Sequence, residues 1–202
     1  SGPGIRMGWK PEPGVGFNPF GTWVGYNEAM ILYILALGSP THPPNYQGIW
    51  FTWTSGYSWQ TQYGHSYVVF PPLFGHQYSH CWVDYRNIQD AYMRFRGITY
   101  FENSRRATLA QRAYCIANPG GFAGYGANGW GITACDGPNG YRARGAPPPQ
   151  DDDGTIAPTA AGGAVPFAPE VAIPTLQYFF DTYNAQLWST YGFKDAFNLT
   201  QN

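Results

Sequence analysis

Charged residues are scarce in this chain of 202 residues. Asp, Glu, Lys and Arg together make up 11% of the sequence, whereas about 25% is usual for soluble domains. The formal net charge is −1, so the chain carries no strong basic surface for nucleic acid or for anionic lipids. We therefore expect neither nucleic acid nor a membrane surface as a partner.

Long hydrophobic runs and cysteine motifs are also lacking. The longest apolar stretch, residues 29–37, is well short of the ~20 residues that cross a bilayer. The three cysteines have no C-x-x-C spacing, which argues against a disulfide framework and predicts buried free thiols. Neither a P-loop lysine nor a G-x-S-x-G turn is present, and we expect no cofactor.

Aromatic residues are abundant instead, at 18% of the chain, with 8 Trp, 16 Tyr and 13 Phe. Carbohydrates present apolar C–H faces and many hydroxyls, which flat rings and neutral polar side chains match; the same rings also suit a large core. Only 12 acids are available, so each acid beside aromatic residues is a candidate for chemistry. The composition favours an enzyme that acts on carbohydrate.

Periodicity and turn residues predict helices linked by long aromatic loops. The predicted helices span about 25–37, 88–95, 103–117 and 170–191, the third capped by Asn103 or Ser104. The predicted short strands are 49–54 and 67–70. Residues 119–166, rich in Gly and Pro, are predicted to be irregular, but their aromatic residues argue against disorder. This pattern fits an all-α toroid with inner and outer rings of helices.

Two glutamates in aromatic surroundings are the candidate catalytic residues. Glycoside hydrolysis needs one carboxyl group to protonate the leaving oxygen and another to activate water or attack carbon. We predict Glu28 as the general acid, because the aromatic loop before it would exclude water, and Glu102 as the second carboxylate or a substrate clamp. The alternatives are a glutamate favoured by the helix dipole for Glu28, and a capping residue paired with Arg105 or Arg106 for Glu102.

Four neighbouring polar residues, His76, Gln77, Tyr78 and His80, are predicted to bind sugar hydroxyls. His76 and His80 have the i, i+4 spacing of zinc ligands on a helix. However, no glutamate follows His76 and no third ligand is evident, so no metal is predicted. The alternative is that the histidines are satisfied inside the core.

Further substrate contacts are predicted at aromatic and acidic positions. Trp130 and Tyr26 are the candidate stacking platforms, and the alternative for either ring is simple packing. Asp152 and Asp153 are predicted to contact sugar or water, with a solvated acidic turn as the alternative. Calcium is not predicted there, because the other EF-hand positions are missing.

A series of motifs resembles the bacterial "putative glucoamylase" domain over roughly residue 8 to the end. The motifs include Gly25-Tyr26-Asn27-Glu28-Ala29-Met30, Gly75-His76-Gln77-Tyr78-Ser79-His80, Trp130-Gly131-Ile132-Thr133-Ala134-Cys135-Asp136 and Pro166-Phe167-Ala168-Pro169-Glu170. This domain is similar to glycoside hydrolase family 144 endo-β-1,2-glucanases and to a domain of cyclic β-1,2-glucan synthases. The resemblance implies an (α/α)6 barrel that hydrolyses β-1,2-glucan or sophoro-oligosaccharides.

The resemblance also bears on domain organisation. A full barrel needs twelve helices and the sequence predicts four or five, so we expect residues 1–202 to be a single partial domain, a fragment of a larger one. We expect an oligo- or polysaccharide substrate and a periplasmic or secreted bacterial location. Two alternatives remain, a protein that binds glucan without cutting it and a polysaccharide lyase. A lyase would require a cationic cleft, whereas the cluster Arg105, Arg106 and Arg112 lies in a predicted helix rather than in a loop.

Overall fold

The computed structural model describes residues 4–17, 20–41 and 45–201. The chain divides into two compact units, residues 1–58 and 59–202. Helices make up most of the regular secondary structure of the described residues, and the sheets described there are short two-stranded pairs. The helical class expected from the sequence is confirmed at this level.

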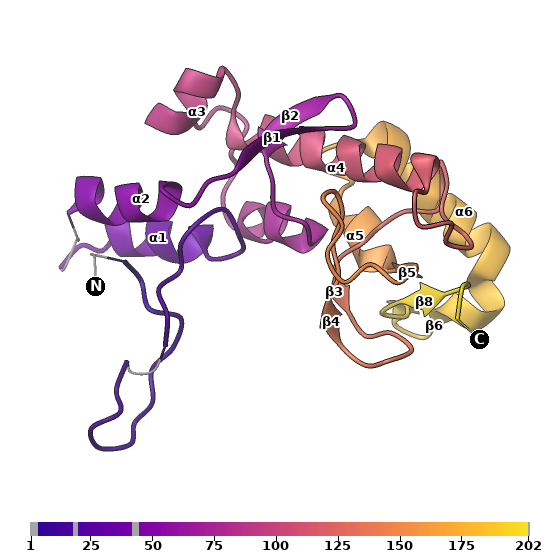
Figure 1. Cartoon of the computed structure of the whole chain (residues 1–202), viewed down its shortest axis with the longest axis horizontal. Helices are drawn as coiled ribbons and strands as arrows, with labels where there is room; N and C mark the ends of the chain where they lie inside the picture. The colour runs from indigo at the N-terminus through magenta and orange to yellow at the C-terminus, as the bar shows by residue number, and fades with distance from the viewer. Residues whose placement is uncertain (1–3, 18–19, 42–44, 202) are drawn as a thin grey trace. The chain divides into compact units, whose positions relative to one another are not determined.

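The smaller unit contains α1 (Met30–Leu37) and α2 (Tyr46–Thr54) (Figure 1). The first helix begins later than predicted, because the Asn27 side chain accepts a hydrogen bond from the Ala29 N–H and holds a turn before it. The prediction of a strand at 49–54 was wrong. Ile49 and Trp53 are buried four residues apart, on one face of a helix, so helical packing overrides the apparent alternation.

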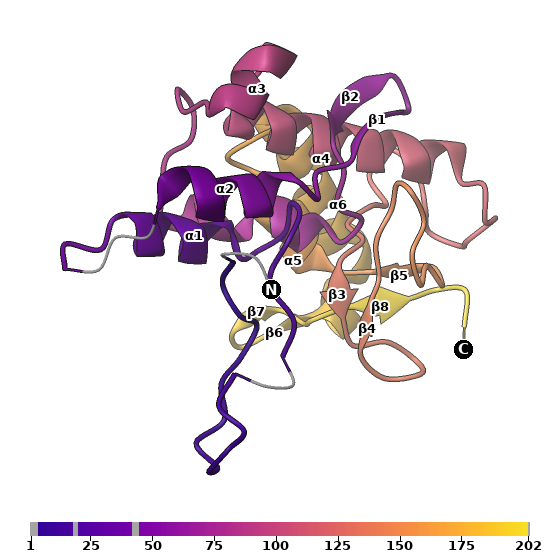
Figure 2. The ribbon, with the colours of Figure 1, turned by 60° about the vertical axis from the view of Figure 1, so that its left-hand side comes forward.

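The larger unit is built around two long helices. Its described helices are α3 (Ala91–Arg96), α4 (Tyr100–Ala117), α5 (Pro158–Gly163) and α6 (Pro169–Leu187), and the 3₁₀ turns η1 (Leu73–His76) and η2 (Tyr78–Cys81) precede them. The antiparallel pairs are β1 (Trp59–Gln62) with β2 (His65–Val68), β3 (Ala134–Cys135) with β4 (Arg142–Ala143), β5 (Thr155–Ile156) with β8 (Phe197–Asn198), and β6 (Trp188–Ser189) with β7 (Gly192–Phe193). The β1–β2 hairpin lies against α4, as Figures 1 and 2 show.

Threonine fixes the start of α4. The Thr99 side chain accepts a hydrogen bond from the Glu102 N–H at 3.0 Å, as an N-cap does. The helix therefore begins at Tyr100, and the predicted caps Asn103 and Ser104 were wrong. Both of these residues are buried inside the first turns of the helix, where they bond to other segments.

Helix α5 lies within the segment predicted to be irregular. Gly162 and Gly163 disfavour a helix, which is why the sequence conceals it. Pro158 occupies its first turn, where the missing N–H costs nothing, and the helix packs against α6. A side chain at Gly163 would collide with the amide of Gln77, so packing requires a glycine there. Helix α6 ends earlier than predicted because the β6–β7 hairpin follows it.

A buried amide ties the segment between α4 and α5 to the core. Gln111 of α4 is 1% exposed, and its Nε2 donates to the carbonyl oxygens of Ile132 at 2.9 Å and Ala146 at 3.0 Å. Its Oε1 accepts from the Ile132 N–H at 2.8 Å. Because buried backbone groups must be paired, this side chain substitutes for the secondary structure that the segment largely lacks.

Two expectations from the sequence concerned buried free thiols and membrane-spanning segments. Cys115 and Cys135 are buried free thiols as predicted, but Cys81 is exposed, because it lies at the surface end of η2. In the described ranges, no helix combines the length and the apolar character needed to cross a bilayer.

Candidate active site

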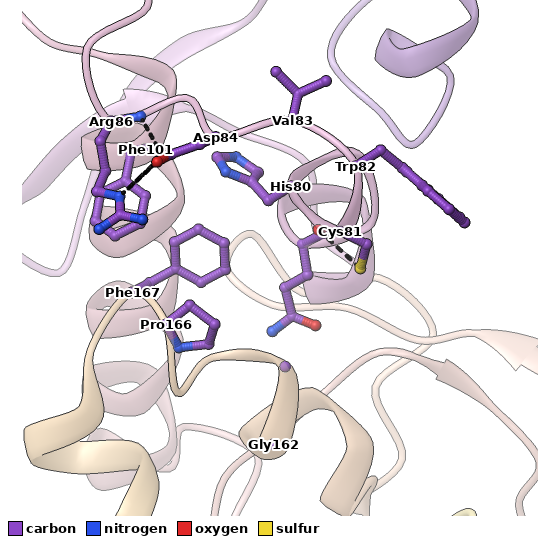
Figure 3. A pocket seen from close by; sticks show the side chains of 12 residues that line it. His80, Cys81, Trp82, Val83, Asp84, Arg86, Phe101, Gly162, Pro166 and Phe167 are labelled. Carbon is purple, nitrogen blue, oxygen red and sulfur yellow. Dashed lines mark hydrogen bonds and ion pairs between the residues drawn. The ribbon is translucent and has the colours of Figure 1, made fainter.

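A cavity of about 600 Å³ lies in the larger unit, between η2, the start of α4 and the turn after α5 (Figure 3). Its walls include Gln77, His80, Phe101, Pro166 and Phe167. Volumes of this order are typical of small-ligand sites. Two of the predicted sugar-binding residues, Gln77 and His80, thus meet in one concave site.

The His80 ring is held in a fixed orientation. It meets Phe167 edge to face with ring centroids 4.8 Å apart, and Tyr85 in the same way at 4.7 Å. Its Nε2 lies 3.0 Å from the Ser104 hydroxyl on α4. Burial lowers the pKa of His80 to about 4, which keeps the imidazole neutral near pH 7.

The other members of the predicted cluster occupy different positions. His76 is 1% exposed, and burial lowers its pKa to about 3, which favours the core alternative for this residue. Gln77 donates its side-chain N–H to the carbonyl oxygen of Ala160 at 2.8 Å. Tyr78 is 48% exposed and is not part of the cavity wall.

Sequence reasoning missed the charged edge and the aromatic wall of the cavity. Asp84 and Arg86 form an exposed ion pair with a closest N–O distance of 2.9 Å, and hydrogen bonding to Arg86 lowers the pKa of Asp84. Phe101 and Phe167 pack with ring centroids 5.1 Å apart. Phe167 lies in a motif that carries the family resemblance, and this was the only sequence signal for it.

Glu102 lies beside the cavity rather than in its wall. Its carboxylate pairs with Arg106 at 2.8 Å, and Arg106 also donates to the Ser66 carbonyl oxygen on β2 at 3.0 Å. The carboxylate therefore lies near the β1–β2 hairpin, with nearby His65, whose pKa is lowered by burial and then by Arg106. The predicted alternative, pairing with Arg106, is observed, yet the Glu102 side chain remains 39% exposed and open to a ligand.

Glu28 and Tyr26 belong to the smaller unit, immediately before α1. Glu28 is partly buried. Tyr26 is 4% exposed and meets Tyr57 edge to face with ring centroids 5.8 Å apart. This burial favours packing over stacking for Tyr26.

The surroundings of Trp130 and Asp152 favour a role in the fold for each. Trp130 is 0% exposed within the core of the larger unit, so packing is the role that the structure favours for it. Asp152 accepts hydrogen bonds from the Tyr114 hydroxyl at 2.7 Å and the Tyr125 hydroxyl at 2.6 Å. Burial, together with this carboxylate, raises the pKa of both tyrosines. Asp152 thus anchors a loop to α4 and is not part of the cavity wall.

Asp153 forms a buried ion pair with Arg144. Two guanidinium nitrogens, Nε and Nη2, donate to its two carboxylate oxygens at 2.8 Å each, and Arg144 is 0% exposed. The hydrogen bonds from Arg144 lower the pKa of Asp153 to about 2. This carboxylate is therefore not the solvated acidic turn that the sequence allowed. Among the described residues, no group of three His, Cys, Asp or Glu side chains is arranged to hold a metal ion.

Known proteins resemble the chain along nearly all of its length. An exo-β-1,2-glucooligosaccharide sophorohydrolase (non-reducing end) of Parabacteroides distasonis is 33% identical over 99% of this chain and 30% of its own length. The crystal structure of a putative glucoamylase from Bacteroides uniformis matches with a TM-score of 0.86 and 37% identity, over 98% of this chain and 48% of that one. An endo-β-1,2-glucanase from Chitinophaga pinensis, in complex with sophorotriose and glucose, matches with a TM-score of 0.81 and 32% identity, over 96% and 47%.

The chain thus spans less than half the length of these relatives. The model of the family described as "Putative glucoamylase" matches residues 21–202, which include the cavity and both candidate glutamates. The chain belongs to this glucoamylase-like family.

Proposed function

We propose that this protein is a glycoside hydrolase that cleaves β-1,2-glucan or sophoro-oligosaccharides. The observation that carries the proposal is likeness along nearly the whole chain to a sophorohydrolase and to an endo-β-1,2-glucanase, at 33% and 32% identity. The family description refers to glucoamylase, which implies α-linked glucan. The two relatives named for a linkage both favour the β-1,2 linkage, and we adopt it.

Within this proposal the two glutamates share the acid–base chemistry. Glu28 donates a proton to the leaving glycosidic oxygen, and Glu102 activates water or attacks the anomeric carbon. The exposure of the Glu102 side chain, 39% beside Arg106, supports its part, because a water or a sugar can reach this carboxylate. We further propose that residues 1–202 form part of an (α/α)6 toroid of the glycoside hydrolase family 144 type.

The proposal is tested by the rate at which the full-length protein releases sophoro-oligosaccharides or glucose from β-1,2-glucan. Glu102→Gln should lower kcat by at least about a hundredfold, a usual loss for an acid–base residue. Glu170→Gln is the matched control, because Glu170 is also an exposed glutamate paired with an arginine, Arg105, at 2.6 Å. This control should retain the wild-type rate.

Three results would contradict the proposal. Full activity in Glu28→Gln or Glu102→Gln would remove that residue from the chemistry. Saturable binding of β-1,2-glucan by the wild-type protein without product would favour a binding protein, and an unsaturated product would indicate a lyase.

A further inference from the structure

Two polar side chains in the cavity of the larger unit, His80 and Gln77, are oriented to accept hydrogen bonds. The Ser104 hydroxyl lies 2.7 Å from the His76 carbonyl oxygen, 3.2 Å from the Tyr100 carbonyl oxygen and 3.0 Å from His80 Nε2. A hydroxyl has one proton, and a carbonyl oxygen can only accept it. Ser104 therefore donates to a carbonyl and accepts from His80, which places the His80 proton on Nε2.

This assignment determines what His80 offers to a ligand. A neutral imidazole protonated on Nε2 has a lone pair on Nδ1, which acts only as an acceptor. None of the described residues makes a hydrogen bond with His80 Nδ1. The ring packs edge to face against Tyr85 and Phe167, which opposes a 180° turn that would put a carbon in the place of each nitrogen.

Gln77, like His80, is oriented so that an acceptor is left for a ligand. Its side-chain N–H donates to the Ala160 carbonyl oxygen, so the amide oxygen is the group left for a ligand. The backbone of Gly163 packs closely against this amide and limits its movement. Two acceptors thus line one cavity, beside the apolar surfaces of Pro166 and Phe167. Figure 3 shows the Trp82 ring directed away from His80 and Phe167.

We propose that this cavity binds one glucose unit of the glucan, with His80 Nδ1 and Gln77 Oε1 each accepting a proton from a sugar hydroxyl. The inference rests on the proposed function for the identity of the sugar. A hydroxyl-rich neutral ligand supplies the two donors that this pair requires, and its C–H face can pack on Pro166 and Phe167. The nearby charges of Asp84 and Arg86 are already paired with each other, so no net charge selects an ionic ligand.

Two substitutions of His80 test this assignment, because they should affect sophorotriose binding differently. Sophorotriose binding is measured by calorimetry on the full-length protein made inactive by Glu102→Gln. His80→Gln can keep a donor near Ser104 but places no acceptor at the Nδ1 position, and it should raise Kd about tenfold. His80→Asn places an amide oxygen near the Nδ1 position, and it should stay within about threefold of the parent protein.

Nitrogen-15 NMR of the imidazole reads the tautomer directly. We expect a protonated Nε2 and an unprotonated Nδ1 whose resonance shifts when sophorotriose is added. A protonated Nδ1, unchanged affinity in both His80 variants, or no sophorotriose binding would overturn the inference. Weakened binding in His80→Gln without any hydrolysis by the wild-type protein would instead retain this site and reject the proposed function. Hydrolysis with unaffected binding in His80→Gln would do the reverse.

Discussion

The buried Arg144–Asp153 pair gives the sharpest prediction about stability. Asp153→Asn is nearly isosteric and keeps an oxygen that can accept from Thr155, which bonds to this side chain in the structure. It removes the charge that faces a guanidinium with 0% exposure. Leaving one member of a buried ion pair without its partner typically costs about 3–5 kcal/mol, and we expect a loss of that size in the free energy of unfolding.

Urea denaturation measures this loss, and the exposed pair of Asp84 and Arg86 supplies the control. The side chains of that pair are 60% and 67% exposed, so Asp84→Asn should change the unfolding midpoint little. Adding Arg144→Met to Asp153→Asn should recover part of the loss, because the stranded charge is then gone. Equal effects of Asp153→Asn and Asp84→Asn would show that burial does not make the first pair costly to break.

Three further predictions concern pH and the buried polar groups. The pKa of Asp153 is lowered from 3.8 to about 2, so its contribution to stability is present above pH 3.8 and is lost as the pH falls toward 2; Asp153→Asn should abolish this part of the acid profile. The pKa of His80 is lowered from 6.5 to about 4, so the unfolded chain binds the extra proton between these values. This histidine should therefore lower the free energy of unfolding by on the order of 3 kcal/mol from pH 6.5 to 4, and His80→Gln should reduce the decline seen in urea titrations by that amount, leaving the part due to His76. Gln111→Leu leaves buried backbone groups of two residues unpaired, so the free energy of unfolding measured in urea should fall by about 3 kcal/mol. Gln177→Leu, at an exposed position of α6, should lower it little. Similar losses in the two variants would contradict the role given to Gln111.

The sequence predicted long helices better than their ends or the short elements. The stripe of apolar residues after Ser104 identified α4, but its cap at Thr99 depends on a single side-chain hydrogen bond that residue preferences do not distinguish from neighbouring candidates. Helix α5 contains two consecutive glycines, and it forms because it packs between α6 and the Gln77 amide. That contact joins residues far apart in the chain, which local patterns do not report.

The candidate site was predictable to a similar extent. The polar cluster around His80 was identified from residue type, and the structure places Gln77 and His80 on a cavity. The same reasoning could not separate them from His76, because burial depends on which side of η1 and η2 meets α4. The sequence around Asp153 has the composition of a solvated turn, and only the fold brings the Arg144 guanidinium against this carboxylate.

We propose above that the protein hydrolyses β-1,2-linked glucose chains. The most direct measurement compares kcat/KM of the full-length protein on β-1,2-glucan, β-1,3-glucan and α-1,4-glucan, with products identified by chromatography. We predict turnover of β-1,2-glucan to sophoro-oligosaccharides or glucose, with the other two linkages left essentially uncut. Preferential release of glucose from α-1,4-glucan, or no product from any of the three, would rule out the proposed activity.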